Sequence, residues 1–216
     1  MLIVFDLDDT LIDTSGSIAP YKLRMLIDLL SKCGRLSQPA EDAYREILQL
    51  DRKMPASRDT IRLTLERYGA EELLSEALKI YSSPLPENFQ IRTTPFAKKI
   101  LLSLSRSHRL AVVTQGREAY QLEKLEKASL EPSIFCKINV VEDCQKKPSY
   151  EALSQEFLMG SESCMAVGDR ILMDLAPACE LGWRTVHMRW GRGRMCQNEE
   201  WVGHSIHDLS ELLEII

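Results

Sequence analysis

The sequence lacks the features that mark several large classes of protein. It contains no dense run of basic residues and carries a formal net charge of −5, so a nucleic-acid backbone is a poor candidate ligand. A small ligand that carries phosphate is compatible with this charge, because the local charge of a binding site matters more there than the net charge. Internal repeats and low-complexity segments are also absent. Hydrophobic residues make up 44% of the 216-residue chain, which is enough for one large domain or a domain with a smaller insertion.

The cysteines show none of the spacings of a metal site or a redox motif. No CxxC pair occurs, and no cysteine has metal-ligand spacing with a histidine, so we expect reduced thiols in a reducing compartment. The start, MLIVFDLDD, has no basic region and only a short apolar run, from which we expect no signal peptide. No apolar run approaches membrane-spanning length. The sequence therefore predicts a cytoplasmic protein without a membrane segment. The cysteines are Cys33, Cys136, Cys144, Cys164, Cys179 and Cys196.

Five short apolar runs are typical of buried parallel strands, which are continuously hydrophobic rather than alternating. Helical patterns separate them, such as TPFAKKILLSLSRS, in which Thr94 is a candidate N-cap and Pro95 the first helical residue. Strands that alternate with helices indicate a parallel sheet covered on both faces. The predicted fold is therefore α/β, a doubly wound parallel sheet. The predicted strands are residues 2–5, 110–113, 138–141, 165–167 and 185–188, and the other predicted helices are EAYQLEKLEKA, SYEALSQEF and the closing HDLSELLEII.

One region interrupts this alternation. No convincing strand occurs between about residues 15 and 90, where YKLRMLIDLL, AEDAYREILQLDR and TIRLTLERYG have helical periodicity. The stretch SSPLPENF, with two prolines, predicts an extended connector back to the sheet. The sequence therefore predicts a sheet-containing core of residues 1–14 and 91–216, with an all-helical insertion of residues 15–90 placed after the first strand.

The first predicted strand ends in a group of acidic residues. Asp6 and Asp8 follow the apolar run LIVF, and ligands of an open parallel sheet bind outside the carboxyl ends of its strands. The alternate spacing lets both side chains approach one point, where a hard divalent cation would make their clustering tolerable. An isolated pair of this kind is more typical of helix capping or of a solvated loop, so its interpretation depends on what the other strands carry.

Three further predicted strands are followed by polar groups that complement these carboxylates. The groups are a hydroxyl, a turn rich in backbone N–H groups, two ammonium groups and two carboxylates. They belong to Thr114, Gly116, Lys146, Lys147, Asp169 and Asp174. Together with Asp6 and Asp8 they supply what phosphoryl transfer needs: a nucleophile, a metal clamp and donors for the phosphoryl oxygens.

In these motifs the chain resembles the haloacid dehalogenase-like hydrolases, which are mostly phosphatases, and it is most similar to the phosphoglycolate phosphatase type. The resemblance rests on four motifs in order: DLDDT (residues 6–10), VVTQG (112–116), KKP (146–148) and GDRILMD (168–174). It covers the whole chain, and the helical insertion after the first motif matches the helical cap of the family. The resemblance implies a Rossmann-like core with an inserted cap that chooses the substrate.

The resemblance also implies catalytic roles. Asp6 would be the nucleophile that forms an aspartyl phosphate, and Asp8 would protonate the leaving oxygen and then deprotonate water. Family members that cleave carbon–halogen bonds lack an acid at the position of Asp8, which disfavours a dehalogenase. Thr114 would hydrogen-bond the phosphoryl group, with Gln115 and Gly116 beside it. Gln115 stands where the family often has a small or amide residue, so a donor to the phosphate differs here.

Magnesium is the implied cofactor. By resemblance it is held by Asp6, the main-chain carbonyl of Asp8 and Asp169, with Asp174 supporting the site. Hard oxygen ligands without thiolate or imidazole groups agree with this metal.

The doubled lysine leaves the catalytic lysine uncertain by one position. Lys147 directly precedes Pro148, which favours an extended backbone, and adjacent residues of an extended segment point to opposite sides. We therefore expect Lys147 to face Asp6 and neutralise charge on it and on the phosphate, and Lys146 to face away.

The predicted function is that of a magnesium-dependent phosphomonoesterase that hydrolyses a small phosphorylated metabolite, with neither nucleic acid nor membrane as partner. A sugar phosphate, phosphoglycolate or a nucleoside monophosphate would each fit. Two alternatives stay open: a phosphomutase on the same scaffold, and a binding or regulatory module without useful turnover. The sequence indicates neither the individual substrate nor the oligomeric state.

Overall fold

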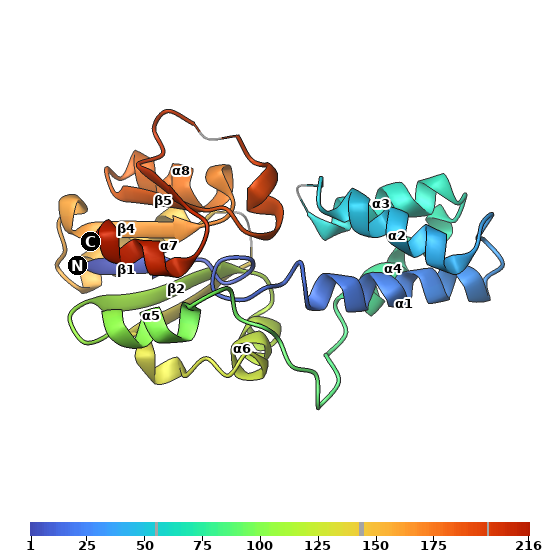
Figure 1. Ribbon diagram of the computed structural model, residues 1–216, viewed down its shortest axis with the longest axis horizontal. Helices are drawn as coiled ribbons and strands as arrows, with labels where there is room; N and C mark the ends of the chain where they lie inside the picture. The colour runs from blue at the N-terminus through green and yellow to red at the C-terminus, as the bar shows by residue number, and fades with distance from the viewer. Residues whose placement is uncertain (55, 143–144, 198) are drawn as a thin grey trace. The chain divides into compact units, whose positions relative to one another are not determined.

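The computed structural model describes residues 1–54, 56–142, 145–197 and 199–216 (Figure 1). The chain forms two compact units, Met1–Thr14 together with Gln90–Ile216, and Ser15–Phe89. Among the described residues, no helix is both long and apolar enough to cross a membrane. The five cysteines of the described part are free thiols, and Cys144 lies outside the described residues.

The first unit is built on a six-stranded parallel sheet with the order β3-β2-β1-β4-β5-β6. This sheet, with helices in the connections, confirms the predicted α/β doubly wound fold (Figure 1). The sixth strand was not predicted, because its three residues, His204–Ile206, lie at the edge and only Ile206 is buried. The strands are β1 (Leu2–Phe5), β2 (Arg109–Gln115), β3 (Lys137–Val141), β4 (Cys164–Gly168), β5 (Arg184–Met188) and β6 (His204–Ile206).

Helices connect the strands and cover the sheet. Two of them, α7 and α8, bury Tyr150, Leu153 and Ala178 against β1, β2 and β4 in one hydrophobic cluster. The principal helices are α5 (Ala97–Leu104), α6 (Glu118–Lys127), α7 (Lys147–Glu156) and α8 (Ala176–Glu180). Shorter helical segments are η2 (Pro132–Ile134), η3 (Ser161–Ser163), the π-helical η4 (Ile171–Leu175), η5 (Gly191–Met195) and η6 (Leu209–Glu214).

Two predicted helix ends differ from the structure. Thr94 and Pro95 precede α5 without capping it, because Phe96 adopts a left-handed conformation with φ 62° and the helix begins only at Ala97. The Thr94 hydroxyl instead donates to the carbonyl of Thr10 at 2.7 Å, which ties the segment entering the sheet unit to the segment leaving β1. The closing segment forms a short 3₁₀ helix, η6, rather than a longer α-helix.

The strand order brings the functional motifs together. β1 lies between β2 and β4, and Phe5 is in register with Val112 of β2 and Val167 of β4. The order of the sheet reverses beside β1, which is where open α/β sheets bind their ligands. The carboxyl ends of β1, β2 and β4 therefore open at the same edge, and the residues that follow them meet there.

The second unit is all helical and is described by itself. Its helices are α1 (Ile18–Lys32), α2 (Ala40–Asp51), α3 (Ser57–Arg67), η1 (Glu71–Leu73) and α4 (Leu74–Tyr81). They share one apolar cluster that includes Leu23, Ile27, Ile47 and Leu65. The buried Lys22 ammonium donates to the main-chain oxygens of Ile80 at 3.3 Å and of Ser83 at 2.6 Å. It therefore caps the carbonyl end of α4, a helix that the sequence pattern did not reveal.

Candidate active site

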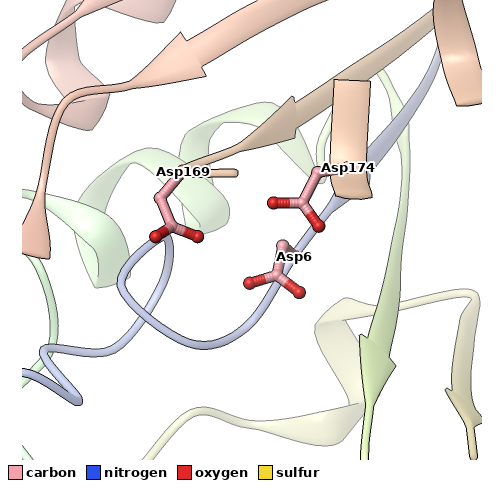
Figure 2. Close-up of side chains that lie close together, drawn as sticks. All are labelled: Asp6, Asp169 and Asp174. Atoms are coloured by element: carbon pink, nitrogen blue, oxygen red, sulfur yellow. The ribbon is translucent and has the colours of Figure 1, made fainter. Parts of the chain in front are cut away.

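Three aspartates form a buried acidic cluster at the carboxyl edge of the sheet. Ligand oxygens of Asp6, Asp169 and Asp174 lie within 4.8 Å of one another, and Figure 2 shows the three carboxylates turned toward a common space. Asp6 directly follows β1 and Asp169 directly follows β4, while Asp174 is on η4. The structure therefore brings together Asp6 and Asp169, which the sequence analysis expected as side-chain metal ligands, and Asp174, which it expected to support the metal site.

Glycine at the end of β4 makes this cluster possible. A Cβ atom on Gly168 would lie 2.4 Å from the Cβ of Asp174, closer than two carbon atoms that are not bonded to each other can approach. The backbone N–H of Arg170 donates to Asp174 Oδ2 at 2.9 Å, which orients that carboxylate. The glycine of the fourth motif is thus required by the close approach of η4 to the strand end.

The negative charge of the cluster is only partly compensated, by the Lys146 ammonium group. Burial raises the pKa of Asp6 to about 7 against the lowering effect of Lys146, and Asp174 raises it further. Burial, followed by the charges of Asp174 and Asp9, raises the pKa of Asp169 well above its ordinary range. Within the described part of the chain, Asp169 Oδ1 is buried and has no hydrogen-bond partner.

These properties fit a hard divalent cation. A buried carboxylate oxygen without a donor costs free energy unless a positive charge or a proton satisfies it. Carboxylate oxygens are the ligands that Mg²⁺ prefers, and the cluster offers no thiolate or imidazole. The donor set of this site therefore agrees with magnesium as the group that completes it.

Lys146 is the cation inside the site. Its ammonium group lies 2.5 Å from Asp6 Oδ1 and 2.7 Å from Asp174 Oδ1, and its side chain is only 4% exposed. Burial alone would lower the pKa of Lys146, but the two carboxylates outweigh it and raise the pKa. Lys146 is therefore charged and bridges the nucleophile candidate to the third metal-ligand candidate.

The predicted orientation of the doubled lysine is wrong. Lys147 points to the surface, where its ammonium group pairs with Glu180 at 2.8 Å, and its side chain is 41% exposed. The segment is not extended: Lys146 has helical dihedrals, φ −78° and ψ −22°, and Lys147 is already the first residue of α7. Pro148 lies in the first turn, where its missing N–H breaks no helical bond, so the chain turns helical before the proline.

The second carboxylate of the first motif belongs to a separate group. Both oxygens of Asp8 accept from the Lys124 ammonium at 2.8 Å, and the hydroxyl of Thr14 and the Nε2 of Gln121 also donate to it. Burial would raise the pKa of Asp8, but Lys124 and these donors lower it. Asp8 is therefore held as a carboxylate, outside the three-aspartate cluster.

A tight turn after β1 separates the two carboxylates. The carbonyl of Leu7 accepts from the N–H groups of Leu11 and Ile12 at 3.0 and 3.1 Å, so the chain coils immediately after the strand. Asp9 takes a left-handed conformation at φ 56°, which aspartate tolerates better than most residues. Asp6 stays at the strand ends, where its N–H donates to the carbonyl of Val167 of β4 at 2.9 Å, whereas Asp8, past Leu7, contacts Lys124 and Gln121 of α6.

The second motif lies beside Asp8. Thr114 is buried near the end of β2, and its hydroxyl accepts from Gln121 Nε2 at 2.8 Å. The main-chain oxygen of Gln115 also accepts from Gln121. The N–H of Gly116 donates to Val141 of β3 at 2.9 Å, so this particular N–H is used within the protein.

Sequence reasoning missed Gln121 and Lys124. Both are buried on α6, three residues apart, and lie on the same face of the helix. Neither belongs to one of the four motifs. The signal available in the sequence was weak, since polar residues at this spacing are also common on solvated helix faces.

The 3₁₀ helix η5 packs closely against Asp9 and against the backbone of Asp169. A Cβ on Gly193 would lie 2.7 Å from the carbonyl of Asp169, and one on Gly191 would lie 2.2 Å from the carboxylate of Asp9. The buried His187 ring lies 3.1 Å from the same Asp169 carbonyl. Glycine at these two positions therefore allows η5 to pack against Asp9 and against the main chain of Asp169.

The raised pKa values predict how stability depends on pH without metal. A carboxyl group whose pKa is higher in the folded than in the unfolded state stabilises the fold at low pH and loses that contribution as pH rises. In excess chelator, the Tm should fall as pH rises from about 5 to about 8, because Asp6 and Asp169 must ionise in the cluster. Added magnesium should raise the Tm more at pH 8 than at pH 6, since the cation replaces protons. Thermal unfolding measured at several pH values, with chelator and with magnesium, shows whether the Tm changes in the expected direction.

The matched variant is Asp169→Asn. In chelator at pH 8 it should raise the Tm by about 2–4 °C, the shift that about 1 kcal/mol produces in a protein of this size, and it should abolish most of the stabilisation by magnesium. An Asp169→Asn protein that is less stable than the unsubstituted chain, yet is stabilised by magnesium to the same extent, would contradict the electrostatic description.

Comparison with known proteins gives one consistent family. The model of the haloacid dehalogenase-like hydrolases matches residues 3–188. The chain is 28% identical over 229 residues to glyceraldehyde 3-phosphate phosphatase of Pyrococcus furiosus, covering 100% of this chain and 92% of the relative. It is 24% identical over 223 residues to the protein of the same name from Methanocaldococcus jannaschii, covering 99% and 96%.

Solved structures show the same fold. The HAD-hydrolase YfnB from Bacillus subtilis superposes with a TM-score of 0.73 at 20% identity, over 99% of this chain and 97% of that one. The haloacid dehalogenase-like protein SP0104 from Streptococcus pneumoniae gives 0.73 at 21% identity with the same coverage. The resemblance seen in the four motifs is confirmed, and the chain belongs to the haloacid dehalogenase-like hydrolases.

Proposed function

We propose that the protein is a magnesium-dependent phosphomonoesterase that hydrolyses a small phosphorylated metabolite through an aspartyl phosphate on Asp6. The observation that carries this proposal is the position of Asp6. Its carboxylate is paired with Lys146 at 2.5 Å and faces Asp169 and Asp174, while Asp8, two residues on, belongs to a separate hydrogen-bonded group. A nucleophile inside a cation site, with an acid–base group beside it, is the arrangement that covalent phosphoryl transfer needs.

In the proposed reaction, Asp6 attacks the phosphorus atom. The bond from phosphorus to the leaving oxygen breaks, and Asp8 supplies the proton that the leaving oxygen takes up. Water then attacks the phosphorus of the aspartyl phosphate and gives a proton to Asp8, and the bond between phosphorus and Asp6 breaks. Lys146 offsets negative charge on Asp6 and the phosphoryl group, and the Thr114 hydroxyl donates to a phosphoryl oxygen.

Magnesium, held by Asp6, Asp169 and the main-chain carbonyl of Asp8 with Asp174 in support, would supply positive charge to the phosphoryl oxygens when bound. The contact with Lys124 lowers the pKa of Asp8, so the arrangement in the structure is the ionised form that accepts a proton from water. To protonate the leaving oxygen, Asp8 must first bind a proton and loosen that contact.

The named relatives indicate which substrate to test first. Relatives that span nearly the whole chain are glyceraldehyde 3-phosphate phosphatases, and we therefore propose a short-chain phosphate ester of this kind. We also propose that the unit Ser15–Phe89 is the cap that selects the substrate. The cytoplasmic location that the sequence predicts stays a prediction.

A panel assay tests the proposed activity. With magnesium, the purified protein should release inorganic phosphate from glyceraldehyde 3-phosphate or another short phosphate ester faster than from nucleoside monophosphates, and excess chelator should abolish release. Formation of an isomeric phosphate ester in place of free phosphate would identify a phosphomutase. Binding of phosphate analogues without turnover on any ester would favour the binding module instead.

The two lysines give the sharpest mutational test of the site. Lys146→Ala should lower kcat by about 10²- to 10³-fold, because one donor to a developing charge is typically worth that much. Lys147→Ala should leave kcat within about twofold, since an exposed ion pair contributes little. Steady-state kinetics on both variants, with folding verified by circular dichroism, show which of the two lysines acts in catalysis. A large loss in Lys147→Ala with near-normal Lys146→Ala would restore the assignment made from the sequence.

A further inference from the structure

Two buried polar side chains of α6 lie outside the four motifs and contact two of the residues assigned to catalysis. Gln121 is 1% exposed and Lys124 is 6% exposed. We propose that Gln121 is a positioning residue that fixes the direction of the Thr114 hydroxyl proton, with Lys124 holding Asp8 beside it. This inference rests on the proposed function, because it gives Thr114 a phosphoryl oxygen to contact.

The orientation of the Gln121 amide is determined by its neighbours. Its Nε2 lies 2.8 Å from Thr114 Oγ1 and 3.3 Å from Asp8 Oδ2, and it also donates to the main-chain oxygen of Gln115. A carbonyl and a carboxylate can only accept, so the amide nitrogen and not the amide oxygen must face them. Within the described residues, Gln121 Oε1 is buried without a partner, which is the cost of this orientation.

This orientation determines where the Thr114 hydroxyl accepts a hydrogen bond and where it can donate one. A hydroxyl has one proton to donate and two lone pairs to accept with. Thr114 Oγ1 accepts from Gln121, and no other hydrogen bond of this hydroxyl occurs among the described residues. Its proton is therefore free to be donated to an anionic oxygen at the edge of the sheet. If the hydroxyl donated to a protein carbonyl instead, it would present a lone pair to the phosphate and repel it.

The second motif is shaped to admit Gln121. Gly116 has φ +146°, and a Cβ atom there would lie 3.1 Å from Gln121 Nε2. That distance is shorter than an ordinary van der Waals contact, so a side chain at position 116 would displace the amide. The glycine of the motif thus provides the space in which Gln121 reaches both Thr114 and the carbonyl of Gln115.

Lys124 completes the group from the next turn of the helix. Its ammonium lies 2.8 Å from each oxygen of Asp8 and 4.9 Å from the ring centre of Tyr120. An ammonium group that contacts both oxygens makes a charge-assisted hydrogen-bonded pair and holds the carboxylate facing α6. Gln121 and Lys124 therefore hold Asp8 and Thr114 next to each other, although Asp8 follows β1 and Thr114 belongs to β2.

A double-mutant cycle on kcat separates positioning from a general structural effect. Gln121→Met preserves length and removes both donors, so it should lower kcat at least about 10-fold, with a smaller change in KM. If Gln121 acts through the Thr114 hydroxyl, the same substitution in a Thr114→Val background should lower kcat less than about threefold further. The exposed Gln155→Met on α7 is the control and should leave kcat unchanged. Gln121→Asn, which keeps the amide but shortens the side chain, should show the same non-additivity and replaces Gln121→Met if that variant does not fold.

The outcomes are distinguishable. A Gln121→Met or Gln121→Asn enzyme with kcat within twofold of the unsubstituted enzyme overturns the positioning role and leaves the proposed function intact. So does an equal fold-loss in the unsubstituted and Thr114→Val backgrounds, which would show that the effect does not pass through the hydroxyl. An unsubstituted protein that releases no phosphate from any ester with magnesium overturns the proposed function, and the inference with it.

Discussion

Three carboxylates buried within 4.8 Å of one another repel strongly, and the rest of the site is organised around that repulsion. The ammonium of Lys146 contacts two of them, and one positive charge does not balance three negative ones. Burial, together with the negative charge that Lys146 does not balance, raises the pKa values of Asp6 and Asp169. Within the described residues, a buried oxygen of Asp169 is also left without a donor. A fold gains nothing in stability from such a cluster, and a bound cation is the group that would relieve the repulsion between its carboxylates.

The sheet topology maintains this unfavourable arrangement. β1, β2 and β4 are adjacent and end at the same edge of the sheet. The positions of Asp6, Thr114 and Asp169 are therefore determined by the order of the strands and not by long loops. The local backbone then sorts the charges into two groups. The coil after Leu7 and the π-helical turn after Gly168 place Asp6 and Asp174 around Lys146. Asp8 points toward α6, where Lys124 and Gln121 donate hydrogen bonds to its carboxylate.

The sequence predicted those features that depend on local and continuous signals. The buried strands were visible as apolar runs, and four motifs in order identified the edge residues Asp6, Thr114, Asp169 and Asp174. The choice between Lys146 and Lys147 failed because the dihedral angles of Lys146 depend on how α7 begins, which the residue types alone do not specify. Gln121 and Lys124 were missed for a related reason. Which face of α6 is buried at the site is decided by tertiary packing, and polar residues carry no sign of it in the sequence.

The most direct test of the proposed reaction is detection of the covalent bond between Asp6 and phosphorus during turnover. Acid quenching of the enzyme in the presence of saturating substrate and magnesium, followed by borohydride reduction, converts an acyl phosphate into an alcohol that mass spectrometry locates in the peptide. We expect this reduction at residue 6, with none when substrate is left out and none at Asp8. Rapid turnover with an unmodified Asp6, or modification at another residue, would contradict it.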